Sequence, residues 1–93
     1  MVVGVLQIDV HLPNARSLKD KRSVIKSVRD QMRGRFNVAV AELEANEKWQ
    51  RATLGIAAVG AERSYVQGLL AEATEWLRAT PLIHLSRVEE EYF

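Results

Sequence analysis

The sequence has 93 residues, enough for one small domain, and its 13 Lys and Arg against 12 Asp and Glu give a formal net charge of +1. Hydrophobic residues make up 47% and charged residues 27%, a balance that excludes an intrinsically disordered chain. The absence of Cys excludes disulfides, thiolate nucleophiles and Cys-ligated metal sites, and no apolar run reaches the ~20 residues of a membrane-spanning helix. We therefore expect a single domain over residues 1–93, cytoplasmic, without a signal peptide and not associated with a membrane.

The first half of the sequence predicts a strand, a helix and a second strand. Residues 2–12 alternate between apolar and other side chains, the period of a strand with one buried face. Ser17 is a good helix N-cap, and the helical spacing that follows runs to about Arg33, with Gly34 as the expected stop signal. The alternation of residues 36–43 predicts the second strand.

The second half repeats this order of elements. Residues 45–50 form a polar connection, and residues 51–60 alternate as a third strand. Residues 62–80 carry apolar side chains at helical spacing and end before Pro81, which cannot continue a helix. Residues 82–90 are the expected last strand.

The resulting order is β-α-β-β-α-β, two right-handed βαβ crossovers joined by a hairpin. This order predicts an α+β fold of the ferredoxin-like split βαβ class. Its four strands form one antiparallel sheet, and both helices cover the same face.

The charges are distributed unevenly along the chain. Residues 1–36 hold eight cations against three acids, a balance of +5, whereas residues 37–93 hold five cations against nine acids, a balance of −4. At 100° per residue, five cations of the first helix fall within an arc of about 80° opposite its apolar face. They are Lys19, Arg22, Lys26, Arg29 and Arg33.

Two interpretations of this cation stripe are open. Like charges at such spacings repel one another by a few tenths of a kcal/mol per pair, so the stripe favours a partner that carries phosphates or acidic groups. The stripe is equally typical of a solvated basic helix face, or of a face paired with acids from another subunit. No aromatic residue flanks these cations, so base stacking is not indicated.

Lys21 falls in the middle of the apolar arc of the same helix, where a buried ammonium group needs a partner. Glu42 is in phase with the apolar residues of the second strand and therefore faces the helix. In a βαβ unit, the helix start and the end of the second strand lie at the same end of the sheet. We expect Lys21 and Glu42 to form an ion pair, with a structural role favoured over a functional one.

Other chemistry-bearing patterns are weaker. His11, Asp9 and His84 could share one face of the sheet, but nothing in their spacing indicates a metal site, and surface histidines are the better interpretation. The sequence has no nucleophile elbow, phosphate loop or dinucleotide fingerprint. We expect neither catalytic residues, nor a metal, nor a cofactor, and we expect the protein not to be an enzyme.

The sheet has a second face that the two helices do not cover. Its centre is expected to be small and apolar, and open apolar patches of this kind usually contact another protein surface. A symmetric homodimer or higher homo-oligomer is the commonest solution, and a half-exposed sheet in a monomer is the alternative. The expected contact residues are Val3, Val5, Ala39, Ala41, Ala57 and Val59.

Three stretches resemble one known family. The sequence reads SLKDKRSVIKSV from Ser17, then RFNVAVAELE, then WQRATLGIAAV from Trp49, and together these resemble the YlxP-like family of small bacterial proteins of unknown function. The resemblance covers nearly the whole chain and implies a ferredoxin-like fold. It also implies a genomic neighbourhood rich in transcription-termination, translation-initiation and ribosome-maturation genes. It brings no catalytic residues, and its signature positions are Lys19, Lys21, Arg22 and Glu42.

Two functional hypotheses follow, and a small enzyme with an unrecognised site is a third alternative. The first is a non-enzymatic accessory protein of RNA or the ribosome whose cationic helix binds phosphates without reading sequence. RNA-recognition-motif domains share this topology but place aromatic residues on the central strands, where this sequence has Val and Ala, so base stacking on the sheet is not expected. The second is a small dimeric regulatory or interaction module with an unidentified ligand.

Overall fold

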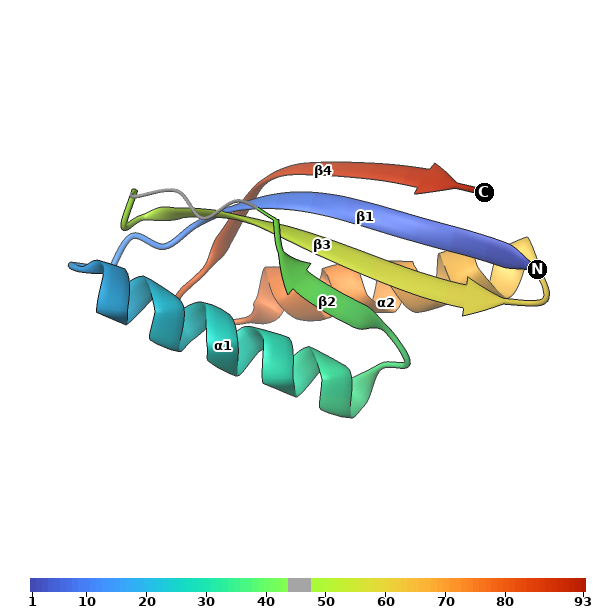
Figure 1. The fold of residues 1–93 in the computed structure, drawn as a ribbon, viewed down its shortest axis with the longest axis horizontal. Helices are drawn as coiled ribbons and strands as arrows, with labels where there is room; N and C mark the ends of the chain where they lie inside the picture. The colour runs from blue at the N-terminus through green and yellow to red at the C-terminus, as the bar shows by residue number, and fades with distance from the viewer. Residues whose placement is uncertain (44–47) are drawn as a thin grey trace.

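The six elements follow the order that the sequence predicts. A computed structural model describes residues 1–43 and 48–93, and the fold it gives this part of the chain is α+β and ferredoxin-like, as expected (Figure 1). Residues 45–47 of the predicted polar connection lie outside the described residues. The elements are β1 (Val2–His11), α1 (Leu18–Arg35), β2 (Ala39–Glu42), β3 (Arg51–Gly60), α2 (Arg63–Ala79) and β4 (His84–Tyr92).

The described strands form one antiparallel sheet in the order β2-β3-β1-β4. β1 and β3 pair along their full length, from Val2 opposite Gly60 to His11 opposite Arg51. Both helices lie on one face of the sheet, α1 against β2 and α2 against β1, β3 and β4, and the other face stays open (Figure 1). The open face and the outer sides of the two helices are therefore the surfaces that the fold leaves for partners.

The core lies between the sheet and the two helices. Alternate residues of β1 and β3 point toward the helices. The helix residues that pack against them are spaced three and four positions apart. Each such apolar side chain stabilises the fold by about 1.5–3 kcal/mol when fully buried. The buried residues with the largest side chains are Ile8, Leu12, Met32, Leu54, Ile56, Leu70 and Leu77.

The predicted stop at Gly34 is wrong. α1 continues through Gly34 to Arg35, and the extended residue Phe36 caps it, with its N–H donating to the carbonyl of Met32 over 2.9 Å. Gly34 has no positive φ, so it does not form the left-handed turn that makes glycine a helix stop. The ring of Phe36 packs edge-on against Trp76 with its centroid 6.4 Å away, a contact that the extended backbone at Phe36 accompanies.

The second strand is shorter than predicted, covering Ala39–Glu42 instead of residues 36–43. The N–H of Val38 donates to the carbonyl of Phe36 over 2.9 Å in a local turn, and pairing with β3 begins only at Ala39. The last strand is displaced toward the C-terminus because Leu82, with φ 76°, belongs to a turn, while pairing with β1 continues to Tyr92. No helix within residues 1–43 and 48–93 is long and apolar enough to cross a membrane.

Candidate nucleic-acid interface

The rotation of α1 about its axis is set at its start and along its core face. The hydroxyl oxygen of Ser17 accepts the Asp20 N–H over 3.0 Å, the N-cap that the sequence predicts. Ile25, Val28 and Met32 are buried against the sheet. This arrangement turns the opposite face of the helix, with its cations, to the outside.

The five cations of the stripe differ in what they contact. Lys19 and Arg22 are exposed, and neither has an ion-pair partner within the described part of the chain. Lys26 is also exposed and donates to the Asp30 carboxylate over 2.9 Å. This hydrogen bond is the main reason that the pKa of Asp30 lies below its ordinary value of 3.8.

Arg29 and Arg33 lie toward β2 and are not equivalent to the other three. A terminal nitrogen of the Arg33 guanidinium donates to the Val40 carbonyl on β2 over 3.0 Å. Arg29 is partly buried, and its Nε is buried without a hydrogen-bond partner among the described residues. The expected cation stripe is therefore divided into an outer group, Lys19, Arg22 and Lys26, and an inner pair beside β2, Arg29 and Arg33.

Further basic residues and an exposed aromatic ring lie beside the first turn of α1. The side-chain amide of Gln50 donates to the carbonyls of Pro13 and Ala15, over 3.2 and 3.4 Å, and the Leu12 N–H donates to the Gln50 carbonyl over 2.8 Å. These bonds hold the segment 48–51 next to the helix start. Its side chains are exposed, and Trp49 keeps 51% of its surface accessible.

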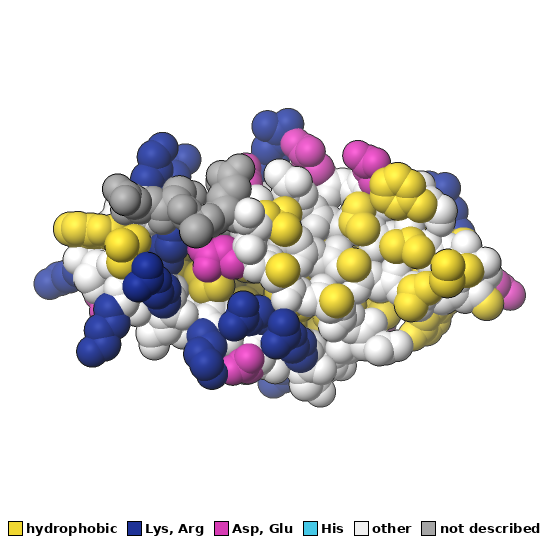
Figure 2. Space-filling view, in the orientation of Figure 1, with side chains coloured by type: hydrophobic (Ala, Val, Ile, Leu, Met, Phe, Trp, Pro, Cys, Tyr) yellow, Lys and Arg dark blue, Asp and Glu magenta, His cyan; other side chains and the backbone are white. Residues whose placement is uncertain are grey.

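Lys and Arg side chains gather at this end of the molecule and along α1 (Figure 2). We define the basic end as Lys19, Arg22, Lys26, Lys48, Trp49 and Arg51. Sequence reasoning did not group Trp49 with these cations, although an aromatic residue between Lys48 and Arg51 in a polar connection was a signal in the sequence.

The buried side chain of Lys21 also holds the segment 48–51 in place. Its side chain is 3% exposed, and its ammonium group donates to the carbonyls of Lys48 and Arg51, each over 3.1 Å. Glu42 lies where the strand phase places it, with Oε2 3.8 Å from the Lys21 nitrogen. The buried cation thus joins the helix start, the end of β2 and the entry to β3.

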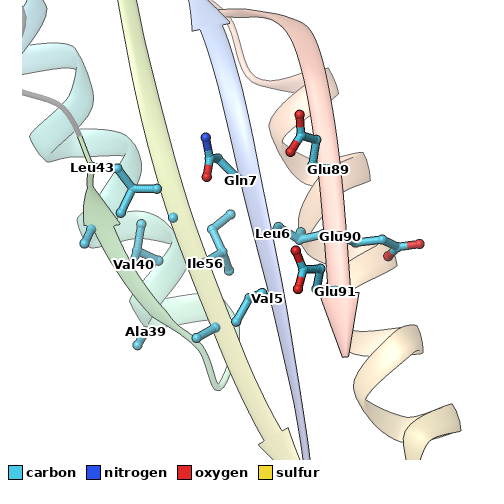
Figure 3. Close-up of a pocket in the computed structure, with 13 residues that line it drawn as sticks. Val5, Leu6, Gln7, Ala39, Val40, Leu43, Ile56, Glu89, Glu90 and Glu91 are labelled. Carbon is cyan, nitrogen blue, oxygen red and sulfur yellow. The ribbon is translucent and has the colours of Figure 1, made fainter. Parts of the chain in front are cut away.

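The open face of the sheet is apolar at its centre and acidic along one side. Val3, Val5, Ala39, Ala41, Ala57 and Val59 lie on this face by strand alternation, and a groove of about 410 Å³ crosses all four strands. Leu43 lies over Gly55, where an added Cβ would come within 2.7 Å of its Cδ2 atom. Glu89 and Glu91 line the β4 side of the groove, whereas Glu90 points away from it (Figure 3).

The histidines form no metal centre in the described residues. His11 and His84 are cross-strand neighbours, but no group of three His, Asp or Glu side chains within residues 1–43 and 48–93 could hold an ion. Asp9 instead accepts a hydrogen bond from the Thr53 hydroxyl over 2.9 Å.

Comparison with known proteins places matches along almost the whole chain. The model of a family described as protein of unknown function (DUF503) matches residues 3–90. The chain is also similar to a protein of Bacillus subtilis (strain 168) named "Uncharacterized protein YlxP", with 29% identity over 92 residues that cover 99% of this chain and 100% of that protein. The matched residues include both α1 and the segment 48–51.

Proposed function

The chain belongs to the DUF503 family, in agreement with the YlxP-like motifs of its sequence. We propose that it is a cytoplasmic, non-enzymatic protein that binds phosphates of RNA, ribosomal RNA included, through its basic end. The family description names no ligand, so the proposal rests on this chain's own side chains. The observation that carries it is the outer group on α1, in which Lys19 and Arg22 are exposed and have no ion-pair partner within the described residues.

The spacing of the three cations of the outer group allows them to contact successive phosphates of a nucleic-acid backbone. Lys19, Arg22 and Lys26 span seven residue steps of a helix, about 10 Å along its axis. Lys48 and Arg51 lie beside the helix start and extend the cationic surface. Three to five neutralised phosphates predict a log–log salt slope of about −2 to −3.5 for a single strand, because each neutralised phosphate releases condensed counterions.

Trp49 adds a feature that phosphate contacts alone do not provide. An exposed indole between cations is a surface on which an unpaired base stacks, with a contribution of about 1–3 kcal/mol per base. A base inside a duplex is already stacked and cannot use it. The protein is therefore expected to prefer single-stranded RNA, with little dependence on base sequence.

The proposal is tested by fluorescence anisotropy with single-stranded and duplex RNA across a range of salt concentrations. The variant K19E/R22E/K26E should bind RNA far more weakly and show a salt slope shallower by about 2–3 units. The variant R63E/R78E/R87E makes the same change in net charge elsewhere on the surface and should bind like the wild type. W49A should weaken binding to single strands more than binding to duplex.

Circular dichroism should show that both triple variants are folded, since all six substituted side chains are exposed and lie outside the core. Equal losses in the two triple variants would indicate non-specific attraction by net charge. A wild-type affinity no tighter than ~10⁻⁴ M at low salt would contradict the proposal. Binding to an acidic peptide instead would assign the basic end to a protein partner.

A further inference from the structure

The open face of the sheet is acidic along β4, and cations of α1 border it beyond the free edge of β2. Glu89 and Glu91 lie along β4, and the centre of the face is lined by small side chains of β2 and β3 (Figure 3). Glu89 also contacts the Arg87 guanidinium, and Glu91 has no ion-pair partner among the described residues. Beyond the free edge of β2 lies the inner pair, Arg29 and Arg33, on the helix that covers the other face.

The inner pair belongs to the flank of α1 that faces the free edge of β2. Arg33 reaches the Val40 carbonyl on β2 over 3.0 Å, and Arg29 lies one helical turn earlier on the same flank. Arg35, on the opposite flank, lies over the Trp76 ring of α2 at 5.6 Å from its centroid. Cationic side chains are accordingly visible beside β2 when the molecule is viewed onto its open face (Figure 2).

The register of the sheet places the acids and the inner pair at the same level along the strands. Glu89 is opposite Gln7, which is opposite Gly55, which is opposite Ala41. Glu91 stands in the next row on this face, with Val5, Ala57 and Ala39. Both acids are therefore level with the stretch 39–41, which is where Arg33 bonds to β2.

From this arrangement we infer that the open face binds a second copy of the same chain, with the two-fold axis parallel to the strands. Such an axis keeps each row level with itself and lays β4 of one copy over β2 of the other. Glu89 and Glu91 of each copy then face Arg29 and Arg33 of its partner, in two symmetric charge clusters.

The alternative face-to-face orientation, with the two-fold axis perpendicular to the strands, lays β4 on β4 and brings four glutamates together. Like charges across an interface are strongly unfavourable, so the charge pattern selects one orientation. The small residues Ala39, Ala41 and Ala57 let the two sheets approach to the usual ~10 Å separation. A second copy fits this face because the cations that complement Glu89 and Glu91 are on the same molecule. They lie at the same height along the strands as the two acids, as the two-fold axis requires.

The test uses sedimentation equilibrium on the wild type and on two variants with opposite charge reversals. The wild type should be a dimer, and A57E should be a monomer because it places a carboxylate at the centre of the contact. E89K/E91K and R29E/R33E should each self-associate at least about 100-fold more weakly, because both clusters become repulsive. An equimolar mixture of the two should form a heterodimer, since each cluster is then complementary.

Glu89 and Glu91 are exposed, so E89K/E91K tests the proposal even where R29E/R33E does not fold, and R29Q/R33Q then replaces the latter. The variant K19E/R22E/K26E should remain dimeric, which separates this interface from RNA binding. A monomeric wild type would overturn the inference and leave the face to another partner. Charge variants that stay as dimeric as the wild type, or a mixture that does not recover association, would overturn the orientation.

Discussion

The two βαβ halves of the molecule have the same topology but are stabilised differently. In the first half, α1 has a side-chain cap at Ser17 and buries a charged residue, Lys21, beside a four-residue edge strand. In the second half, α2 has no side-chain hydrogen bond at its N-cap Glu62, and it precedes a nine-residue strand. The buried residues of α2 are all apolar, namely Val66, Leu70, Ala73 and Leu77.

This difference shows that both helices contribute to the core, but only α1 also buries a charge. α2 packs across the central strands β1 and β3, and its buried face is entirely apolar. α1 lies beside the end of β2, where the chain enters and leaves the sheet and carbonyl groups are available to Lys21. The basic segment that the sequence shows in residues 1–36 thus becomes a basic side of the molecule, opposite the acidic edge at β4.

The largest expected effect is on α2. Leu70→Ala removes a side chain that is 1% exposed and should lower the free energy of unfolding by about 2–5 kcal/mol, because the rigid surroundings leave a cavity. Leu69→Ala, at a partly buried position one residue earlier, is the matched control and should cost less. Urea denaturation measures both, and equal losses would show that the buried face of α2 does not contribute to the core.

The next effect concerns the buried charge of α1. Lys21→Met should cost about 3–5 kcal/mol because it strands polar groups that the ammonium satisfies. Glu42→Gln should cost only about 1 kcal/mol, since Lys21 keeps the carbonyls of Lys48 and Arg51 and the Glu42 side chain is 24% exposed. The strand phase brings Lys21 and Glu42 together, but the carbonyls of Lys48 and Arg51 are the stronger partners of the Lys21 ammonium group.

A double-mutant cycle on the same denaturation measurement quantifies the coupling between the two side chains, which should be about 1 kcal/mol. A loss at Glu42 as large as the loss at Lys21 would show that the carboxylate, and not the carbonyls, holds the ammonium. Strictly additive losses would show that the 3.8 Å contact carries no energy.

The smallest effects are at the two helix starts and should have opposite signs. Ser17→Ala removes the hydrogen bond to the Asp20 N–H and should destabilise the protein by about 1 kcal/mol. Glu62→Ser supplies a capping hydroxyl at a position whose backbone is already extended and should stabilise it by about 0.5–1 kcal/mol. Thermal melting of both variants decides this, and a stabilising Ser17→Ala would contradict the assigned cap.

Much of the fold could be predicted from periodicity alone. The period of two in residues 2–12 and 51–60 identified the core face of the central strands, and helical spacing identified the apolar arc of α1 together with Lys21 inside it. The expectation that Glu42 faces Lys21 came from the same strand phase, combined with βαβ geometry. These features are properties of consecutive residues, so one sequence is enough to find them.

The remaining features depend on contacts between distant segments. The Phe36 ring lies against Trp76 where α1 ends beyond Gly34, and the Val38 turn precedes the shortened β2, neither of which a local propensity contains. The bonds of Gln50 that place Trp49 beside α1 cross more than thirty positions of the chain. The sequence by itself determined which faces are apolar and which are charged. Tertiary structure alone decided which charges stand level with one another, because strand register is set by pairing across the sheet and not by the order of residues along one strand.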